Sequence, residues 1–411
     1  MKEEWQSKKL GEICDIELGK TPSRSNASFW DEKRQTGNVW LSIADLLNTD
    51  GNFVHESKEY LSDKGAAISK IVRKGTLMVS FKLTLGRLAY AGCDLYTNEA
   101  IAALTIFDEH CVSKKFIFYF LHFFDWDQAT EGDIKIKGRT LNKAKLKEIL
   151  VHYPSLPEQQ RIVAILDEAF ESIAIAKANA EKNLQNAKAL FDSYLQGVFS
   201  HGGEGWSIKI LGDTSILKII DGDRGSNYPN KEDFSDDGFC LFLNTKNVRP
   251  DGFNFDKTMF VSEEKDKSLR KGKLQRQDVI LTTRGTIGNV AIFDESVEFE
   301  NIRINSGMLI FRVNPEELLP SFLYEVFRSG IMKEQMTRYV SGAAQPQLPI
   351  KTLINFEIPI PNSLAAQGKI VDGVRAINHE TQRLESIYQQ KITALDELKK
   401  ALLHQAFSGQ L

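Results

Sequence analysis

Residues 158–163 read Glu-Gln-Gln-Arg-Ile-Val, and they open a helix-like run that closes with Val-Phe-Ser at 198–200. The chain repeats this run later, opening with Ala-Gln-Gly-Lys-Ile-Val at 366–371 and closing with Ala-Phe-Ser at 406–408. Every landmark of the second run lies 208 residues after its counterpart, so the two runs align without a gap. A repeat of this length predicts a duplicated architecture.

Both runs place a mainly apolar residue at every third or fourth position, which is the period of helices that pair along a stripe. In the first run the predicted seam is Ile162, Leu166, Ala169, Ile173, Ala176, Ala180, Asn183, Ala187, Leu190 and Tyr194. In the second run it is Ile370, Val374, Ile377, Thr381, Leu384, Tyr388, Lys391, Leu395, Leu398 and Leu402. The polar step at Asn183 and Lys391 either sets the register or is a solvated position. We predict that the two helices pack on each other.

The rest of the chain falls into two blocks that share a frame. Residues 1–155 combine strands, turns and short helices, and residues 206–361 repeat this plan weakly. The frame is repeated at 80–86 and 282–288, whereas the loops between such anchors differ. Loops that differ on a shared frame are typical of two scaffolds that bind different targets, although drift after duplication produces the same pattern.

The order block, helix, block, helix sets the predicted fold class. We expect an α+β chain with a first block at 1–155, a central long helix at 156–200, a second block at 206–361 and a C-terminal long helix at 363–411. Because the link at 201–205 is short, the second helix must run back antiparallel to the first. This predicts a coiled-coil spacer with pseudo-two-fold, circular organisation. From Ile162 to Tyr194 it would extend about 48 Å.

Composition and motifs argue against an enzyme. The chain has 411 residues, a net charge of −3 and four cysteines without CxxC spacing, which indicates core thiols in a reducing cytoplasm. It has no apolar run of membrane-spanning length and no signal peptide, so we expect a soluble cytoplasmic protein without a membrane partner. GxxxxGK[ST], HExxH and GxSxG motifs are absent, and the histidines are scattered, so no catalytic residue, metal site or cofactor is predicted.

Several polar residues suit a nucleic-acid partner. Six basic residues without an intervening acid occur within 135–147, including Lys135, Lys137 and Arg139; this run either neutralises phosphates or is a solvated loop. Lys82 and Arg284 occupy matching positions of the repeated frame. Arginine, asparagine and glutamine side chains match base edges in the major groove, although each is also an ordinary loop residue. On these grounds the other candidate DNA contacts are Arg24, Asn26, Arg87, Arg224, Asn227, Asn289, Gln345 and Gln347. Arg24 with Asn26 and Arg224 with Asn227 fall in matching polar loops of the two blocks.

These pieces resemble the DNA-specificity (S) subunit of type I restriction–modification enzymes over the whole chain. The most specific piece is Pro-Ser-Leu-Pro-Glu-Gln-Gln-Arg-Ile at 154–162, a helix entry. Leu-Gly-Lys-Thr-Pro-Ser-Arg-Ser at 18–25, Ile-Leu-Thr-Thr-Arg-Gly-Thr-Ile-Gly at 280–288 and Phe-Ser-Gly at 407–409 also fit. The second copy departs from the pattern, because Ala-Ala-Gln-Gly at 365–368 replaces Pro-Glu-Gln-Gln; this predicts a less tightly capped helix start.

The resemblance implies a function without chemistry of its own. Each target-recognition domain would read one half of a bipartite site on double-stranded DNA, while the paired helices hold the gap and dock two modification (methyltransferase) subunits. Restriction (endonuclease and translocase) subunits would join them, and S-adenosylmethionine, Mg and ATP would be bound by these partners. A non-catalytic protein–protein scaffold is the alternative, and a self-contained endonuclease is a third hypothesis. The half-site sequences depend on loop geometry and DNA shape.

Overall fold

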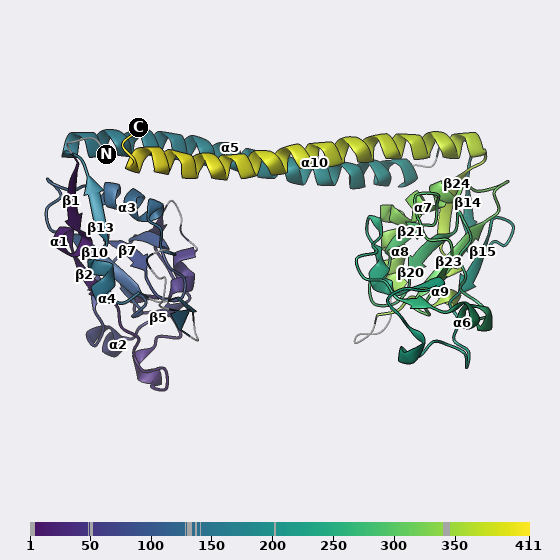
Figure 1. Ribbon diagram of the computed structural model, residues 1–411, viewed down its shortest axis with the longest axis horizontal. Helices are drawn as coiled ribbons and strands as arrows, with labels where there is room; N and C mark the ends of the chain where they lie inside the picture. Colours follow the sequence, from purple (N-terminus) through teal and green to yellow (C-terminus); the bar gives the residue numbers. More distant parts are fainter. Residues whose placement is uncertain are drawn as a thin grey trace. The chain divides into compact units, whose positions relative to one another are not determined.

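The computed structural model describes residues 5–47, 49, 52–127, 129, 134–135, 138–139, 141–200, 203–339 and 346–411, with the backbone alone at 134–135 and 138–139. The chain divides into two compact units, Met1–Ala180 with Gln390–Leu411, and Glu181–Gln389. Each unit therefore contains one block together with one end of each long helix, α5 (Leu156–Ser200) and α10 (Leu364–Phe407) (Figure 1). Among the described residues, no helix is both long and apolar enough to cross a membrane.

Unit 1 is built on a five-stranded sheet in the order β2-β10-β7-β8-β4 and a four-stranded sheet in the order β5-β3-β9-β6. The strands of the larger sheet are β2 (Cys14–Leu18), β10 (Ile101–Ile106), β7 (Leu77–Ser80), β8 (Leu88–Ala91) and β4 (Phe53–Val54). Those of the smaller sheet are β5 (Glu59–Tyr60), β3 (Val39–Leu41), β9 (Leu95–Thr97) and β6 (Ile71–Val72). The pairs β4–β8 and β3–β9 are parallel and the other pairs are antiparallel.

Short elements complete unit 1. β1 (Gln6–Lys9) pairs with β13 (Leu150–Tyr153) directly before α5 begins. The remaining elements are α1 (Leu10–Ile13), η1 (Ala27–Phe29), η2 (Ile43–Leu47), α2 (Asp63–Ala67), α3 (Lys114–Phe123), β11 (Ile134–Lys135), β12 (Gly138–Arg139) and α4 (Lys143–Lys147).

Unit 2 repeats this topology. Its main sheet has the order β15-β23-β20-β21, with strands β15 (Leu217–Asp221), β23 (Met308–Val313), β20 (Val279–Thr282) and β21 (Val290–Ile292). Its second sheet has the order β19-β16-β22, with strands β19 (Phe260–Val261), β16 (Cys240–Leu243) and β22 (Ile302–Ile304). β14 (Trp206–Ile210) pairs with β24 (Glu357–Pro361) before α10, as β1 pairs with β13 before α5. The remaining elements are η4 (Lys231–Asp233), η5 (Thr245–Asn247), β17 (Val248–Arg249), β18 (Gly252–Phe253), α6 (Glu263–Ser268), α7 (Pro320–Arg328), α8 (Gly330–Tyr339) and α9 (Ile350–Leu353).

The repeated frame is clearest at one turn of the main sheet. In unit 1 the Ser80 hydroxyl donates to the Thr84 carbonyl and accepts from the Arg87 amide. In unit 2 the Thr282 hydroxyl makes the same two contacts, with the Thr286 carbonyl and the Asn289 amide. A hydroxyl at this position closes the turn from inside. Both units therefore present the same rigid loop from the same sheet edge.

Aromatic rings attach each block to the long helices. In unit 1, Phe407 of α10 packs edge-on to Phe116 of α3, with ring centroids 5.2 Å apart. In unit 2, Phe199 of α5 packs on Phe322 of α7 at 5.6 Å. Phe199 and Phe407 are the terminal landmarks of the sequence repeat. Burial of such large rings is strongly stabilising, so the end of each long helix belongs to the core of a unit.

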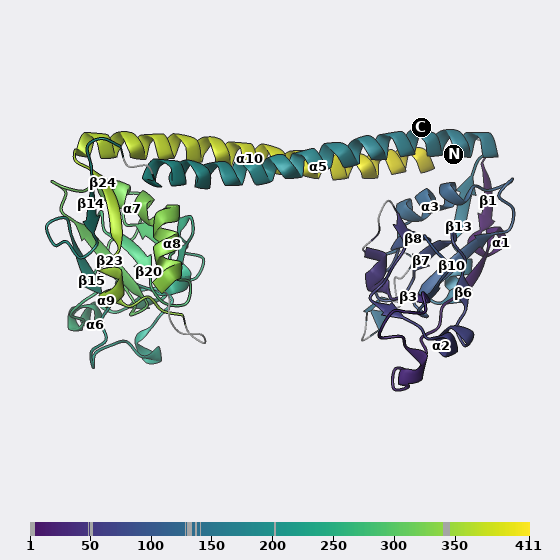
Figure 2. The same cartoon turned by 180° about the vertical axis from the view of Figure 1, so that it is seen from behind.

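Within each unit the two long helices lie side by side and antiparallel (Figures 1 and 2). In unit 1, Lys177 of α5 pairs with Asp396 of α10 at 2.6 Å, and Ile162 shares a core with Phe407. Seven predicted seam residues are buried, namely Ile162, Leu166, Ile173, Ala180, Ala187, Val374 and Thr381. Nine are half-buried, namely Ala169, Ala176, Tyr194, Ile370, Ile377, Leu384, Tyr388, Leu395 and Leu402.

Two predicted seam positions are wrong. Leu190 is 48% exposed and Leu398 is 47% exposed, whereas Leu195 and Leu403 are buried. A straight α-helix drifts relative to a strict 3.5-residue repeat, so a heptad extended to the end of the run loses its phase. Near the C-terminal end of each long helix, the face that carries Leu195 or Leu403 packs against a block. The polar step at Asn183 and Lys391 is solvated.

The second helix start is also capped, contrary to the expectation from its divergent sequence. The Ser363 hydroxyl accepts a hydrogen bond from the Ala366 amide at 3.2 Å. Serine is among the preferred residues for this role, because its side chain satisfies an amide that has no partner within the helix. The change to Ala-Ala-Gln-Gly at 365–368 therefore leaves the helix start capped.

Candidate nucleic-acid interface

Unit 2 has a polar cavity of about 540 Å³ at the edge of its main sheet. Its wall is formed by the loop between β20 and β21, the segment between β22 and β23, and the segment that precedes α9. The lining residues are Thr245, Arg284, Gly285, Asn305, Ser306, Gly307, Pro346 and Gln347. Loops held by a rigid sheet are the usual place for recognition residues.

The backbone beneath Arg284 is held from two sides. Its amide donates to the Gly307 carbonyl at 3.2 Å, and Arg284 forms a β-bridge with Gln347. The next turn is held by the Thr286 hydroxyl, which donates to the Thr245 carbonyl at 3.3 Å. The Arg284 side chain is exposed. This arrangement presents a guanidinium on a fixed backbone, which suits a phosphate or the edge of guanine.

Arg224 approaches the same cavity from the loop after β15. Its guanidinium lies 3.2 Å from the Asp221 carboxylate and 3.3 Å from the Ser306 carbonyl. The structure thus brings together Arg224, Arg284 and Gln347, three candidates that are far apart in the sequence. Gln347 is exposed beside them, whereas Gln345 lies outside the described residues.

The equivalent place in unit 1 has different chemistry. Lys82 occupies the position of Arg284, and its neighbour Glu99 accepts a hydrogen bond from the Thr21 hydroxyl at 2.5 Å. This hydrogen bond, helped by the nearby Lys82 cation, outweighs partial burial and holds the pKa of Glu99 below its usual range. Unit 1 therefore offers a carboxylate and a lysine at the position where unit 2 offers two arginines.

Arg24 is engaged within the fold. Its guanidinium forms a two-pronged ion pair with Glu59 and lies over the Trp30 ring at 4.0 Å and the Trp40 ring at 4.7 Å. A contact between Arg24 and DNA would have to compete with this pair. Arg87, by contrast, is exposed on the frame loop of unit 1.

The predicted asparagine candidates are used for structure. Asn26 caps η1 by accepting from the Ser28 amide, Asn227 donates to the Ser268 carbonyl, and Asn289 donates to the Val248 carbonyl. Each amide group therefore fixes a loop. Any base contact by these three side chains would use their remaining hydrogen-bonding capacity.

The two polar loops correspond differently from the sequence prediction. The structural counterpart of Asn26 is Asn230, since each caps a 3₁₀-helix, whereas the sequence paired Asn26 with Asn227. The aromatic pair beneath Asn26 is repeated as well: Trp30 and Trp40 in unit 1 correspond to Phe234 and Phe242 in unit 2. Asn26 lies seven residues after Gly19 and Asn230 lies eight residues after the equivalent Gly222, so the loop of unit 2 is one residue longer and the register shifts between the copies.

The basic run at 135–147 lies partly outside the described residues. The backbones of Lys135 and Arg139 belong to the two-stranded pair β11–β12, and Lys137 is not among the described residues. The remaining lysines of the run lie on α4, whose start is capped by Asn142. The role proposed for this run therefore stays a prediction.

The sequence carried one further signal at this site. Asn98 and Asn305 each accept a hydrogen bond from the amide two residues later, at Ala100 and Gly307. The two asparagines are 207 residues apart, the same shift that relates Leu141 to Leu348 and Pro154 to Pro361. This pair of asparagines marks the segment that lines the cavity of unit 2, and it was not among the residues predicted from the sequence.

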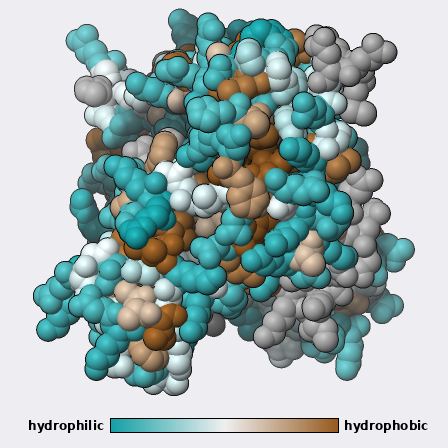
Figure 3. Space-filling model, turned by 90° about the vertical axis from the view of Figure 1, so that its left-hand side faces the viewer, coloured by the Kyte–Doolittle hydropathy of each residue, from teal (hydrophilic) through white to brown (hydrophobic). Residues whose placement is uncertain are grey.

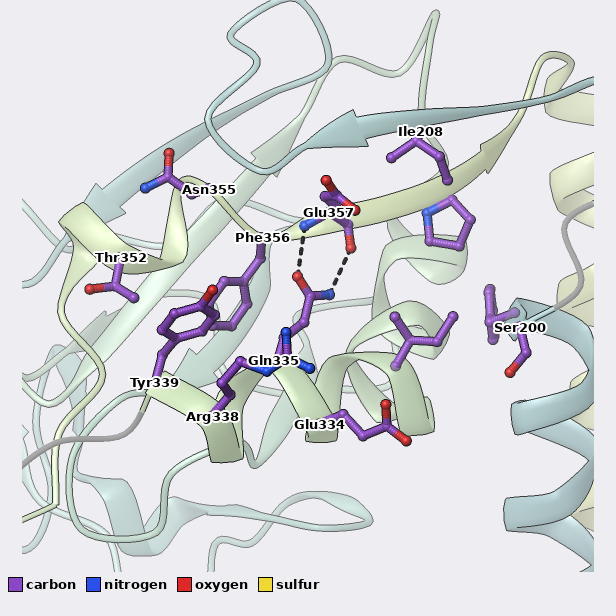
Figure 4. Close-up of a pocket in the computed structure, with 13 residues that line it drawn as sticks. Ser200, Ile208, Glu334, Gln335, Arg338, Tyr339, Thr352, Asn355, Phe356 and Glu357 are labelled. Atoms are coloured by element: carbon purple, nitrogen blue, oxygen red, sulfur yellow. Dashed lines mark hydrogen bonds between the residues drawn. The ribbon is translucent and has the colours of Figure 1, made fainter.

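A second cavity in unit 2, of about 520 Å³, lies between α8, β14, β24 and the end of α5 (Figure 4). Gln335 spans it by donating to the Glu357 carbonyl and accepting from the Glu357 amide, both at 2.9 Å. Arg338 and Tyr339 lie at its mouth on α8. None of the predicted DNA-contacting residues lines this cavity.

A family model for the type I restriction modification DNA specificity domain matches residues 2–186 and 204–394. The chain belongs to this family. Among its relatives, the type I restriction enzyme MjaIX specificity subunit of Methanocaldococcus jannaschii is 24% identical over an alignment of 436 positions, which covers 99% of this chain and 94% of the relative. The EcoBI specificity subunit of Escherichia coli is 23% identical over 336 residues, covering 76% of this chain and 69% of the relative.

Two solved structures share the fold. One is a chain from work on complex assembly and conformational transition of the type I R-M system, with a TM-score of 0.75 and 19% identity over 100% of this chain and 99% of that one. The other is the HsdS subunit from Thermoanaerobacter tengcongensis, with a TM-score of 0.62 and 18% identity over 100% and 98% of the two chains. The family resemblance and the two-domain α+β architecture are thereby confirmed.

Family membership also decides between the functional hypotheses. The chain is a sequence-specific DNA recognition subunit of the restriction–modification type, and it is non-catalytic, as specificity subunits are. The scaffold and endonuclease hypotheses are set aside on this ground.

On the face of the molecule shown in Figure 3, hydrophilic residues separate the hydrophobic ones into smaller areas.

Proposed function

We propose that each unit reads one half of a bipartite site on double-stranded DNA, and that the two halves differ in sequence. The observation that carries the proposal is the contrast between equivalent frame positions. Unit 1 has Thr21, Lys82 and Glu99 there, and unit 2 has Arg224, Arg284 and Ser306.

These side chains favour different base edges. A guanidinium donates two hydrogen bonds to the O6 and N7 atoms of guanine, whereas a carboxylate accepts from the N4 amino group of cytosine. A carboxylate also repels phosphates, so the unit 1 loop is expected to approach the DNA backbone less closely at Glu99. The same frame with different charged groups at its tip supports the readout of two unlike sequences.

We further propose that α5 and α10 hold the gap between the half-sites and dock two modification subunits. The gapless repeat of the helices and the blocks attached to their ends support this role. Restriction subunits would join the same complex in the cytoplasm. S-adenosylmethionine, Mg and ATP would be held by these partners, which carry out the methylation and cleavage.

Methylome sequencing tests the proposal. A host that carries this chain with its modification partner is compared with the same host after deletion of this chain. Deletion should remove one bipartite methylated motif, which also identifies both half-sites. A methylome in which every motif survives the deletion would refute the proposed function.

A variant assigns one half-site to unit 2. Replacement of Arg284 by alanine should change methylation at one half of the motif and leave the other half as strict as before. The matched control is K351A, because Lys351 is also exposed in unit 2 but does not line the cavity. Equal relaxation of both halves by R284A would contradict the assignment of one half-site to each unit.

A further inference from the structure

A buried glutamine lies at the start of each long helix. Gln159 on α5 is 0% exposed, and Gln367 on α10 is 1% exposed. The two residues are 208 apart, so they occupy the same step of the helix repeat. Buried glutamines are uncommon, and a buried amide must be fully hydrogen-bonded to avoid a large desolvation cost.

In unit 1 the Gln159 side chain joins three segments. Its Oε1 atom accepts from the amide of Ser113, the N-cap residue of α3, at 2.9 Å. Its Nε2 group donates to the Cys111 carbonyl at 3.0 Å and to the Pro154 carbonyl, just after β13, at 2.9 Å. The amide therefore fastens α5 to the block by both its donor and its acceptor.

In unit 2 the Gln367 side chain makes the equivalent three bonds. Its Oε1 atom accepts from the amide of Leu319, the N-cap residue of α7, at 2.8 Å. Its Nε2 group donates to the Glu317 carbonyl at 2.9 Å and to the Pro361 carbonyl, at the end of β24, at 3.3 Å. The same three structural elements are joined in the same way.

The neighbouring contacts between block and helix are not shared. In unit 1, Asp167 of α5 accepts from the Tyr119 hydroxyl and from Lys115, both at 2.6 Å. In unit 2 the equivalent step of α10 carries Arg375, a cation that interacts electrostatically with the buried Glu325 of α7. Residues beside Gln367 have also changed from the first copy. The three-bond amide latch is thus common to two attachments whose neighbouring charged residues differ.

We propose that Gln159 and Gln367 are positioning residues for half-site spacing, an inference that rests on the proposed function. Each latch fixes the direction in which a recognition block leaves its helix. A block that is free to swing would still read its own bases, but it would accept a half-site displaced along the DNA. Loss of one latch should therefore relax selectivity for the gap and leave base selectivity intact.

The test replaces each glutamine by methionine, which has a similar length and shape but no amide. The control is Q160M, because Gln160 is exposed on the same turn of α5. The specificity chain is assembled with its modification subunits, and binding is measured on duplexes that carry the methylated motif with its natural gap or with one base pair added or removed. In Q159M and in Q367M, the preference for the natural gap should fall by about fivefold or more, the scale of one lost buried hydrogen bond. Q160M should match the wild type.

A second measurement on the same samples separates positioning from a merely structural role. Single base changes within each half-site should weaken binding by Q159M and Q367M by the same factor as for the wild type. Unchanged gap preference in both variants would overturn the inference. Loss of base selectivity along with gap preference would also overturn it, because the block itself would then be damaged. A wild-type chain that directs no bipartite motif would instead refute the proposed function.

Discussion

A buried ion pair in unit 2 supports the loops of the candidate interface, and we expect its removal to destabilise both the unit and the interface. The Arg303 Nε atom lies 2.5 Å from a carboxylate oxygen of Asp266, and the two residues are 5% and 3% exposed. The same guanidinium donates to the backbone carbonyls of Asp266, Leu269 and Lys271. One side chain on β22 therefore holds α6 and the segment that follows it.

Replacement of Arg303 by methionine should destabilise unit 2 strongly. Asp266 would remain buried with Lys273, at 2.6 Å, as its remaining cationic partner, and three carbonyls would lose a donor. Removal of one partner of a buried pair costs about 3–5 kcal/mol. This is a large part of the roughly 5–15 kcal/mol that stabilises a folded domain.

The loss should reach the interface, because the segment after α6 holds the Arg224 loop. The Asp223 carboxylate accepts from the amides of Arg270, at 2.6 Å, and Gly225, at 2.7 Å. Partial burial opposes ionisation, yet these backbone hydrogen bonds, led by that from Gly225, hold the pKa of Asp223 below its usual range. We therefore expect R303M to weaken DNA binding even though Arg303 is buried away from the cavity.

Hydrogen–deuterium exchange of the full chain measures the effect locally. Protection of β22 should fall by about 100-fold or more, the factor that corresponds to a loss of about 3 kcal/mol. β10 in unit 1 is the internal control, and R249M is the matched variant, since Arg249 is an exposed arginine of unit 2. The double variant D266L/R303M should recover much of the loss, because neither buried charge is then left without its partner.

Two results would refute this reasoning. Protection of β22 in R303M within tenfold of the wild type would show that the pair contributes little to the stability of unit 2. A double variant as unstable as R303M would show that the lost packing volume, rather than the uncompensated Asp266 charge, causes the effect.

Three further predictions concern single residues. R284A should weaken binding to the methylated motif by roughly 5- to 150-fold and relax selectivity at one base position. Fluorescence-anisotropy titration at fixed salt measures the affinity, with K351A as the control that should match the wild type. Equal affinities of R284A and K351A would contradict the prediction. L195A should lower the free energy of unfolding by about 2–5 kcal/mol, and L190A should change it by no more than about 0.5 kcal/mol, as measured by denaturant unfolding. Equal losses would show that Leu190 packs in the seam as the heptad pattern predicted. Burial raises the pKa of Asp266, but the hydrogen bonds from its cationic partners outweigh burial and leave it lowered. The resulting stabilisation is present above the unfolded-state pKa of about 3.9 and is lost as the pH falls through the lower folded-state pKa. The melting temperature of the wild type should therefore drop in that acid range by more than the melting temperature of D266N does. Equal drops in the two proteins would contradict a stabilising role of the pair.

The sequence by itself determined the duplicated plan, the α+β class and the family. The shift of 208 between the helix copies and the repeated anchors at 80–86 and 282–288 are local patterns that can be read along the chain. The 3.5-residue period likewise predicted paired helices, because a helix must bury its apolar stripe. These features depend on residue order alone.

Tertiary structure decided which of the candidate side chains are available to a ligand. Arg24 pairs with Glu59, 35 residues away, and Asn26 proved equivalent to Asn230 because a one-residue difference in loop length shifts the register. The assembly of the cavity around Arg284 and the burial of Gln159 also depend on segments that are distant in sequence. Side-chain availability is set by such long-range packing, and a periodic pattern carries no information about which distant backbone group will face a given side chain.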